Sequence, residues 1–445
     1  CFWKEILWRA PFQNKLIIFG TLNKPMKNFR TLTLLLLLLV SNIYAQSEEV
    51  IDWDYEIDLL ARELADKHPD LFFHRDSAWF FHEMNEVAAE APGHSIFQVS
   101  VRLQQVIAAM GDAQTQINYH FLIEKSRILP VESYWFEEGI FILETDRLYE
   151  PLLGKKLIAI NGVPIEVVID SLSTLLVLDN QSVLKNSIPR MLTWFQVLEY
   201  FGFTSENSVR LTVRNASGIE EEAVIEVPLE LGEMLTVKPS SIPLGWQDQK
   251  TYFWDRYFEN EQLYYIQYNR CWSREAEEDY GSGASALFMP SLKEFEKQVF
   301  PVIRKKKINK LVFDMRFNKG GYAGQGTEFI GKICKSLPRD YGDVYVLVGR
   351  TTCAEAIINT IDFMNSTSVI LVGEETCGKP NYFGEVKRFV LPESSLIVSH
   401  PTIYISQLEE DFPTVLPDIA APIGFEQYLK GIDPAMEAVR QRALP

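Results

Sequence analysis

An abrupt turn between two regular segments carries side chains that could do chemistry. The stretch GRTTCAEAIIN (349–359) follows the apolar run VYVLV and leads into a run with helical spacing. Many hydrolases hold their nucleophile at such a strand-to-helix turn. Cys353 offers a thiol there, and a thiolate is a good nucleophile. The turn therefore predicts a site for nucleophilic chemistry, although the neighbouring Ala354 carries no reactive atom.

A glycine-rich loop is expected to lie beside this turn. The apolar run LVFDM (311–315) is followed by RFNKGGYAGQG and then by the helix-like TEFIGKIC. Strand, loop and helix alternate in this way as far as VILVG (369–373), which predicts an α/β fold with parallel βαβ units. Loops that follow neighbouring parallel strands emerge at the same edge of the sheet, where ligands bind. We therefore expect 318–321 to lie next to 351–355.

The segment GEETCGKP (373–380) has almost the spacing of a phosphate-binding loop but not its chemistry. Pro380 stands where a hydroxyl would hold Mg²⁺, and proline has no backbone N–H to donate. Glu374 and Glu375 would face the phosphates. The sequence that follows reads as a strand and not as the helix whose amino terminus would hold the anion. We predict that the protein binds no nucleotide.

The remaining patterns divide the chain into regions. Apolar residues recur at three- and four-residue steps over 51–110 and predict helices, one of them capped by Asp76 and ended after Ala91 by Pro-Gly. Short apolar runs between turns predict strands from Tyr134 to Leu229, with a helix inserted over 167–178. The predicted organisation is a helical amino-terminal domain (46–125), a small β domain (130–230), a linker (230–250) and a core domain (250–435).

The amino terminus has the pattern of an export signal. From Met26 the sequence reads MKNFRTLTLLLLLLVSNIYAQ, with a basic start, an apolar run too short to span a membrane, and small residues up to Ala45. Residues 1–45 are therefore interpreted as upstream residues and a signal peptide. We expect an exported protein, in the periplasm, the cell envelope or the extracellular space.

Charge and composition argue against several kinds of partner. The formal net charge is −17, and removal of residues 1–45 takes away six Lys/Arg and one acid, which leaves −22. So acidic a surface repels phosphate backbones, and nucleic acid is not an expected partner. The cysteines and histidines that remain show no metal-ligand spacing, so no metal is predicted.

Four stretches in combination resemble the C-terminal-processing (tail-specific) serine peptidase family, including its tricorn-like branch. They are LVFDMRFNKGG, VYVLVGRTTCAEAIINTIDFM, VILVGEETCGKPNYFGEV and VLPDIAAP. GKKLIAINGVPI resembles the ligand groove of a PDZ-like domain, and MGDAQT stands where the family has G-D-G-H-T. The resemblance implies a crotonase-like core, a PDZ-like β domain, no cofactor, and a peptide or unfolded protein segment as the partner.

In this family a serine attacks a peptide carbonyl, and backbone N–H groups hold the resulting oxyanion. The resemblance assigns one such donor to Gly320 or Gly321. It assigns the other to the residue after the nucleophile, which is Glu355 here.

Two positions depart from the family pattern. Counted back from Lys379, the position of the serine is occupied by Ala354, which has no nucleophilic atom. The position of the histidine base in the tricorn-like branch is occupied by Gln114, whose amide does not titrate. Other lineages use a lysine base with a glutamine four residues on, but Phe383 follows Lys379 at that step. The resemblance therefore implies that the chain keeps the fold and the loops of the family but lacks the side chains of the nucleophile and the base.

Several roles stay open for the residues around these positions. Cys353 could be a relocated nucleophile with His120 as its base, a cysteine packed beneath the turn, or one half of a disulfide with Cys377. Asp314 and Arg316 are expected to form a structural ion pair that supports the glycine-rich loop.

Three functions follow as hypotheses. The first is an exported homologue of tail-specific peptidases that has lost hydrolysis and keeps a groove for peptides. The second is an active peptidase that uses Cys353, Lys379 or Glu385. The third is a scaffold without enzymatic activity that docks the tails of partner proteins through the PDZ-like region. The sequence does not predict the oligomeric state.

Overall fold

The computed structural model describes residues 51–227, 232–338 and 341–442. The described residues from Asp52 onward form one compact unit. The predicted signal peptide lies outside the described residues. Among those residues, no helix combines the length and the apolar character needed to cross a membrane.

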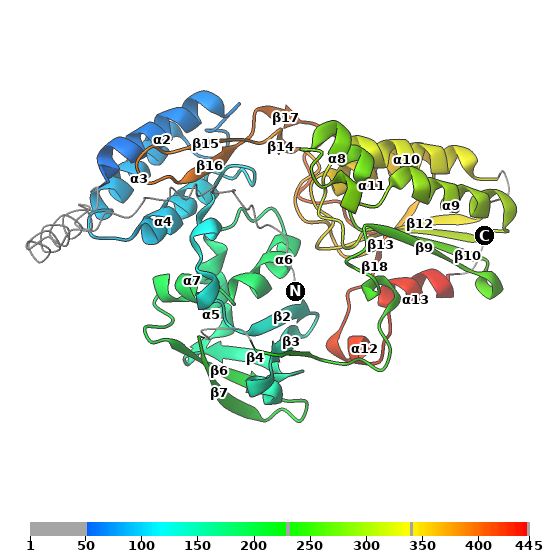
Figure 1. Ribbon diagram of the computed structural model, residues 1–445, viewed down its shortest axis with the longest axis horizontal. Helices are drawn as coiled ribbons and strands as arrows, with labels where there is room; N and C mark the ends of the chain where they lie inside the picture. The colour runs from blue at the N-terminus through cyan, green and yellow to red at the C-terminus, as the bar shows by residue number, and fades with distance from the viewer. Residues whose placement is uncertain (1–50, 228–231, 339–340, 443–445) are drawn as a thin grey trace, which may run out of the picture. The chain divides into compact units, whose positions relative to one another are not determined.

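A six-stranded sheet forms the core of the carboxyl-terminal half, as predicted (Figure 1). Its order is β18-β13-β12-β11-β10-β9, with all neighbours parallel except β9, which is antiparallel to β10. The strands are β9 (Phe253–Phe258), β10 (Leu263–Tyr268), β11 (Lys310–Asp314), β12 (Asp343–Val348), β13 (Ile370–Gly373) and β18 (Ile419–Ala420).

Helices cover both faces of this sheet, because alternate side chains of its strands point to opposite sides. Tyr264 and Ile266 of β10 pack into one apolar cluster with α9 (Leu292–Lys305), α10 (Ala323–Ser336) and α11 (Glu355–Ser366). Tyr265 of the same strand packs on the other face, against α13 (Pro434–Gln441). The short helices α8 (Arg274–Tyr280) and α12 (Phe425–Leu429) complete this half of the chain.

The glycine-rich loop is shorter than the sequence predicted. Helix α10 begins at Ala323, so the last four residues of RFNKGGYAGQG form its first turn. A Cβ atom on Gly326 would lie 1.9 Å from the side-chain oxygen of Asn359 in α11. This glycine therefore serves a close approach of two helices and not a flexible loop.

The amino-terminal region is helical, as predicted, with α2 (Trp53–Lys67), α3 (Ser77–Glu90) and α4 (Ile96–Ala109). Asp76 caps α3 through the backbone N–H of Trp79, at 2.8 Å. The chain returns to these helices from the core, because β1 (Gln116–Ile117) pairs with β16 (Ile397–His400), which pairs with β15 (Lys387–Val390). Figure 1 shows these late strands beside the early helices.

The segment NYFGEVKRFVL, predicted as one strand, forms two strands in different sheets. Its first part is β14 (Tyr382–Gly384), which pairs with β17 (Ile403–Ile405), and its second part is β15. Glu385 between them has a positive φ of 54°, which breaks the extended backbone.

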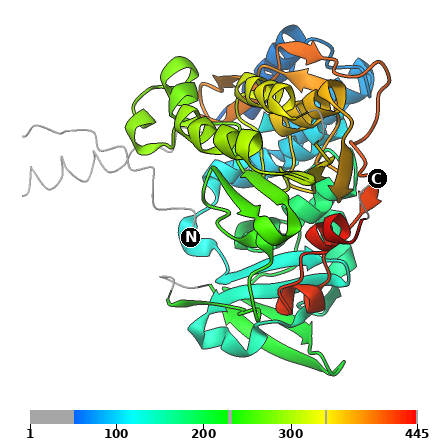
Figure 2. The ribbon, with the colours of Figure 1, turned by 90° about the vertical axis from the view of Figure 1, so that its right-hand side faces the viewer.

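The middle of the chain forms an antiparallel sheet in the order β2-β3-β4-β6-β7, whose strands are labelled in Figure 1 and seen from a second side in Figure 2. Its strands are β2 (Val131–Phe136), β3 (Gly139–Asp146), β4 (Lys156–Ile160), β6 (Ser208–Arg214) and β7 (Glu220–Glu226), with the short β5 (Val163–Pro164) on β4 and β8 (Met234–Thr236) on β3. The predicted inserted helix is α5 (Ile165–Ser173). The sequence did not predict α6 (Gln181–Met191) or α7 (Phe195–Tyr200), and part of the predicted linker is β8.

A buried ion network fixes the start of the glycine-rich loop. Arg316 contacts Asp314 at 2.6 Å and Asp433 at 2.8 Å. The hydroxyl of Tyr265 donates to Asp314 at 2.7 Å. Both carboxylates are buried, so they depend on this guanidinium for compensation. The predicted ion pair between Asp314 and Arg316 is confirmed and extends to the carboxyl-terminal helix.

Replacement of Arg316 should destabilise the protein strongly. Arg316→Met leaves two buried carboxylates unpaired, and the free energy of unfolding should fall by roughly 3–5 kcal/mol. Urea unfolding followed by circular dichroism measures this. Arg62→Met is the control, because Arg62 and its partner Asp58 are exposed and such pairs contribute at most about 0.5 kcal/mol. Equal effects of the two changes would contradict the structural role of the network.

Candidate functional site

The turn after β12 has the strained geometry of a nucleophile elbow. Ala354 is the N-cap of α11 and has φ 50° and ψ −121°, a conformation that costs a non-glycine residue about 1–3 kcal/mol. The hydroxyl of Thr352 donates to the carbonyl of Met315 at 2.9 Å and accepts from the N–H of Gly349 at 3.0 Å. These bonds hold the turn in place, with Ala354 at its tip.

The glycine-rich loop lies directly against this turn, as the parallel strands predicted. The N–H of Cys353 donates to the carbonyl of Asn318 at 3.1 Å. A Cβ atom on Gly320 would lie 3.2 Å from that of Ala354. The two loops therefore touch at the position that the sequence assigned to the nucleophile.

Both glycine N–H groups predicted as oxyanion donors are already hydrogen-bonded. The N–H of Gly320 donates to the side-chain oxygen of Asn318 at 2.9 Å. The N–H of Gly321 donates to a carboxylate oxygen of Glu355 at 2.9 Å. Glu355 was predicted to offer its backbone N–H, and its side chain in addition accepts from the N–H of Gly321. The sequence shows that Glu355 is an acidic residue at the start of α11, but it does not show that the N–H of Gly321 is the hydrogen-bond partner of its side chain.

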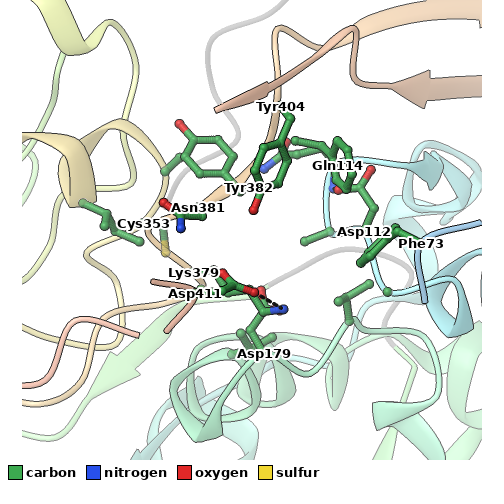
Figure 3. A pocket seen from close by; sticks show the side chains of 18 of the residues that line it. Phe73, Asp112, Gln114, Asp179, Cys353, Lys379, Asn381, Tyr382, Tyr404 and Asp411 are labelled. Carbon is green, nitrogen blue, oxygen red and sulfur yellow. Dashed lines mark hydrogen bonds and ion pairs between the residues drawn. The ribbon is translucent and has the colours of Figure 1, made fainter. Parts of the chain in front are cut away.

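A cavity of about 620 Å³ opens at this turn. Gln114, Cys353, Ala354 and Lys379 all line it, so the structure brings these four predicted positions together. Figure 3 shows Gln114 and Cys353 on opposite sides of the cavity in that view. The sequence did not identify the other labelled wall residues, which come from distant segments: Phe73, Asp112, Asp179, Asn381, Tyr382, Tyr404 and Asp411.

Gln114 belongs to a turn that is held by a buried carboxylate. Asp112 accepts hydrogen bonds from the N–H of Gln114 at 3.0 Å and from the hydroxyl of Thr115 at 2.5 Å. The Nε2 atom of His68 lies 3.1 Å from Asp112, and its Nδ1 atom accepts from the N–H of Asp70. Both ring nitrogens of His68 are thus engaged inside the protein, which leaves neither of them to act as a base toward the cavity.

Two further residues proposed as chemical groups lie elsewhere. His120 is in a 3-10 helix (Tyr119–Leu122), and burial lowers its pKa. Neither His120 nor Glu385 is among the residues that line the cavity. Phe383 does line it and packs against the ring of His68, at 4.7 Å between centroids.

Lys379 lies between two carboxylates of the cavity wall. Its Nζ atom is 3.7 Å from Asp179 and 3.9 Å from Asp411. Burial raises the pKa of Asp179 to about 6, although the nearby Lys379 acts to lower it. The cavity therefore holds a carboxyl group that is protonated at mildly acid pH.

Cys353 does not have the electrostatics of a nucleophile. The neighbouring Cys377 and burial together raise the pKa of Cys353 well above its usual value. The thiol of Cys353 donates to the carbonyl of Arg350 at 4.0 Å. The neighbouring Cys353 lowers the pKa of Cys377. Cys271, Cys334, Cys353 and Cys377 are all free, so the disulfide considered above is not formed in this structure.

Comparison with known proteins identifies the fold. No protein-family model and no curated protein matches the sequence. The crystal structure of mature CPAF matches with a TM-score of 0.59 at 11% identity, over 88% of this chain and 96% of that one. A serine-to-alanine mutant of CPAF matches with 0.58 at 12% identity, over 88% and 96%. The photosystem II D1 C-terminal processing protease matches at 13% identity over 87% and 99%, with a TM-score of 0.37, too low to support an argument.

At these identities the likeness shows the fold alone. The chain has a mixed α/β fold with a parallel sheet and a helical amino-terminal region, and this fold is shared with mature CPAF. The resemblance to tail-specific peptidases that the motifs indicated is thereby confirmed at the level of the fold.

Relief of the strain at the turn should stabilise the protein. Ala354→Gly removes about 1–3 kcal/mol of backbone strain and adds about 0.5–1 kcal/mol of chain entropy, so we expect a net gain near 1 kcal/mol in urea unfolding. Ala89→Gly is the control, because Ala89 is exposed in α3 and the same change there should destabilise by about 0.5–1 kcal/mol. A loss of stability in both variants would contradict the strained geometry.

The carboxyl group of Asp179 in the cavity wall should make the stability of the protein depend on pH. Its pKa is about 6 in the folded protein and 3.8 for an unperturbed aspartate. As pH rises, the unfolded chain therefore releases this proton before the folded chain does. Wild-type protein should therefore lose up to about 3 kcal/mol relative to Asp179→Asn between about pH 4 and pH 7. Unfolding free energies measured across that range test this, with Asp58→Asn as an exposed control. A difference independent of pH would contradict it.

Proposed function

We propose that this protein is an exported homologue of tail-specific peptidases that binds peptide or unfolded protein segments and has lost hydrolysis. One observation carries the proposal. The elbow conformation is kept at Ala354, beside the glycine-rich loop, but the residue at its tip has no atom that could attack a carbonyl.

The surroundings of the elbow support this function. Gln114, at the position of the base, lines the same cavity and has no titratable group. The N–H of Gly321, one predicted oxyanion donor, is bound to a carboxylate of the protein itself. The cavity wall includes aromatic side chains at Phe73, Tyr382 and Tyr404, which suit an extended chain with apolar side chains.

The proposal includes finer assignments of architecture. The sheet of β10 to β13 is a crotonase-like core over 250–435. The antiparallel sheet over 130–230 is a PDZ-like domain that contributes to peptide binding, and 46–125 is a helical domain. Residues up to 45 direct export.

Two alternatives predict different outcomes of the two experiments below. A cysteine peptidase would need Cys353 as its nucleophile, and the raised pKa of that thiol argues against it. A scaffold that docks partner tails through the PDZ-like region alone would bind without using the cavity.

Cleavage of a fluorescently labelled unfolded protein tests the loss of hydrolysis. The native chain should show no turnover. Gln114→His with Ala354→Ser restores the two reactive groups and should give weak cleavage. Addition of Glu355→Ala frees the N–H of Gly321 and should raise kcat by roughly 10²-fold, the contribution of one oxyanion donor. Turnover by the native chain that is lost in Cys353→Ala would instead establish the cysteine peptidase.

Binding of the same labelled protein, followed by anisotropy, tests the role of the cavity. Val183→Trp fills the cavity from α6 and should weaken binding at least about tenfold, which corresponds to about 1.4 kcal/mol. Leu148→Trp is the matched control, because Leu148 is 82% exposed and does not line the cavity. Binding unchanged by Val183→Trp would favour the scaffold, and no binding by the native chain would refute the proposal.

A further inference from the structure

Two free thiols face each other across the base of the turn. Cys353 and Cys377 are partners in an isolated parallel β-bridge, in which the N–H of Cys377 donates to the carbonyl of Thr352 at 3.0 Å. Bridged strands lie about 4.8 Å apart, within the range of α-carbon separations that a disulfide spans. Both cysteines line the cavity, so a small reagent can reach them.

The two thiols have different electrostatic surroundings. The sulfur of Cys377 accepts a hydrogen bond from the side-chain amide of Asn186, at 3.8 Å, which favours its ionised form. The thiol of Cys353 instead donates to the carbonyl of Arg350, at 4.0 Å, which favours its protonated form. The neighbouring Cys353, the Asn186 amide and the charge of Lys319 act to lower the pKa of Cys377, against the effect of burial. Cys377 is therefore the more readily ionised of the two thiols.

The other two cysteines lack this arrangement. Cys271 is fully buried, and its thiol donates to the side-chain oxygens of Asn318 and Asn359. Burial raises the pKa of Cys334 to about 11. Neither lines the cavity.

We propose that Cys353 and Cys377 form a reversible disulfide site, in which Cys377 attacks a small-molecule disulfide and Cys353 resolves the product. With oxidised glutathione, the sulfur of Cys377 bonds to one glutathione sulfur and releases the other as a thiolate. Cys353 then loses its proton, and its sulfur attacks that of Cys377 and releases the second glutathione thiolate. The protein loses two electrons and two protons, and one glutathione disulfide becomes two glutathione thiols.

This site goes beyond the proposed function and does not depend on it. The new bond would join the elbow that carries Ala354 to the loop after β13 that carries Lys379, both of which line the cavity. Oxidation would therefore fix two walls of the cavity relative to each other.

Equilibration of the folded wild-type chain in glutathione buffers of increasing oxidising strength tests the proposal without any variant. After alkylation of the remaining thiols, peptide mapping by mass spectrometry should show residues 353 and 377 joined, with Cys271 and Cys334 alkylated after unfolding. Cys334→Ser is the matched control and should form the same bond to the same extent. Absence of the linked peptide in the most oxidising buffer would overturn the proposal.

Two single variants test the order of attack. Cys353→Ser should accumulate a mixed disulfide of Cys377 with glutathione, because no resolving thiol remains. Cys377→Ser should react with oxidised glutathione roughly tenfold more slowly, since Cys353 alone keeps the less reactive thiol. Circular dichroism confirms that each variant is folded. Equal rates in the two folded variants, or a faster rate in Cys377→Ser, would overturn the assignment of Cys377 as the attacking thiol.

Discussion

One buried amide side chain holds the loops of the candidate site together. Asn318 follows β11 and is fully buried. Its Nδ2 atom donates to the carbonyl of Tyr268 at the end of β10, at 2.9 Å, and its Oδ1 atom accepts from the N–H of Gly320. Its own carbonyl accepts from the N–H of Cys353 after β12. A buried amide left unpaired costs roughly 1–3 kcal/mol, so the carboxyl ends of three neighbouring strands are fixed relative to one another.

The parallel core could be predicted because its strands are apolar on both faces and its helices follow at regular spacing. The limits of prediction lie where tertiary contacts decide the local structure. Gly326 reads as loop, yet it lies in the first turn of α10, because a Cβ atom at this position would collide with the side chain of Asn359 in α11. The strand-like run after Asn381 splits at Glu385 because β14 pairs with β17, whereas β15 pairs with β16, the strand that also joins β1 of the amino-terminal region. No local pattern in the sequence indicates this change of partner.

The sequence predicted the part of the candidate site that is formed by loops at the carboxyl edge of the parallel sheet. The strand order placed Asn318 near Cys353, and the structure agrees. The cavity walls from Asp112 and Asp179 were not predictable from the order of the strands, because they come from the turn after α4 and from the segment before α6, far away along the chain. The pairing of Glu355 with Gly321 shows the same limit. The sequence identified both residues, but it did not predict that the carboxylate of Glu355 would accept the hydrogen bond of the N–H group that was assigned to a substrate oxyanion.

The strain at Ala354 shows what maintains the elbow. In an active enzyme a strained turn can be ascribed to the need to expose its nucleophile, but alanine exposes nothing reactive. The conformation persists because Thr352 ties the turn to the carbonyl of Met315 and because Asn318 holds Cys353, so the neighbouring strands over-determine it. The conformation of the turn therefore does not depend on a reactive atom at its tip. The elbow and the cavity are thus built without a reactive atom at this position, which is the arrangement that the proposed binding function requires.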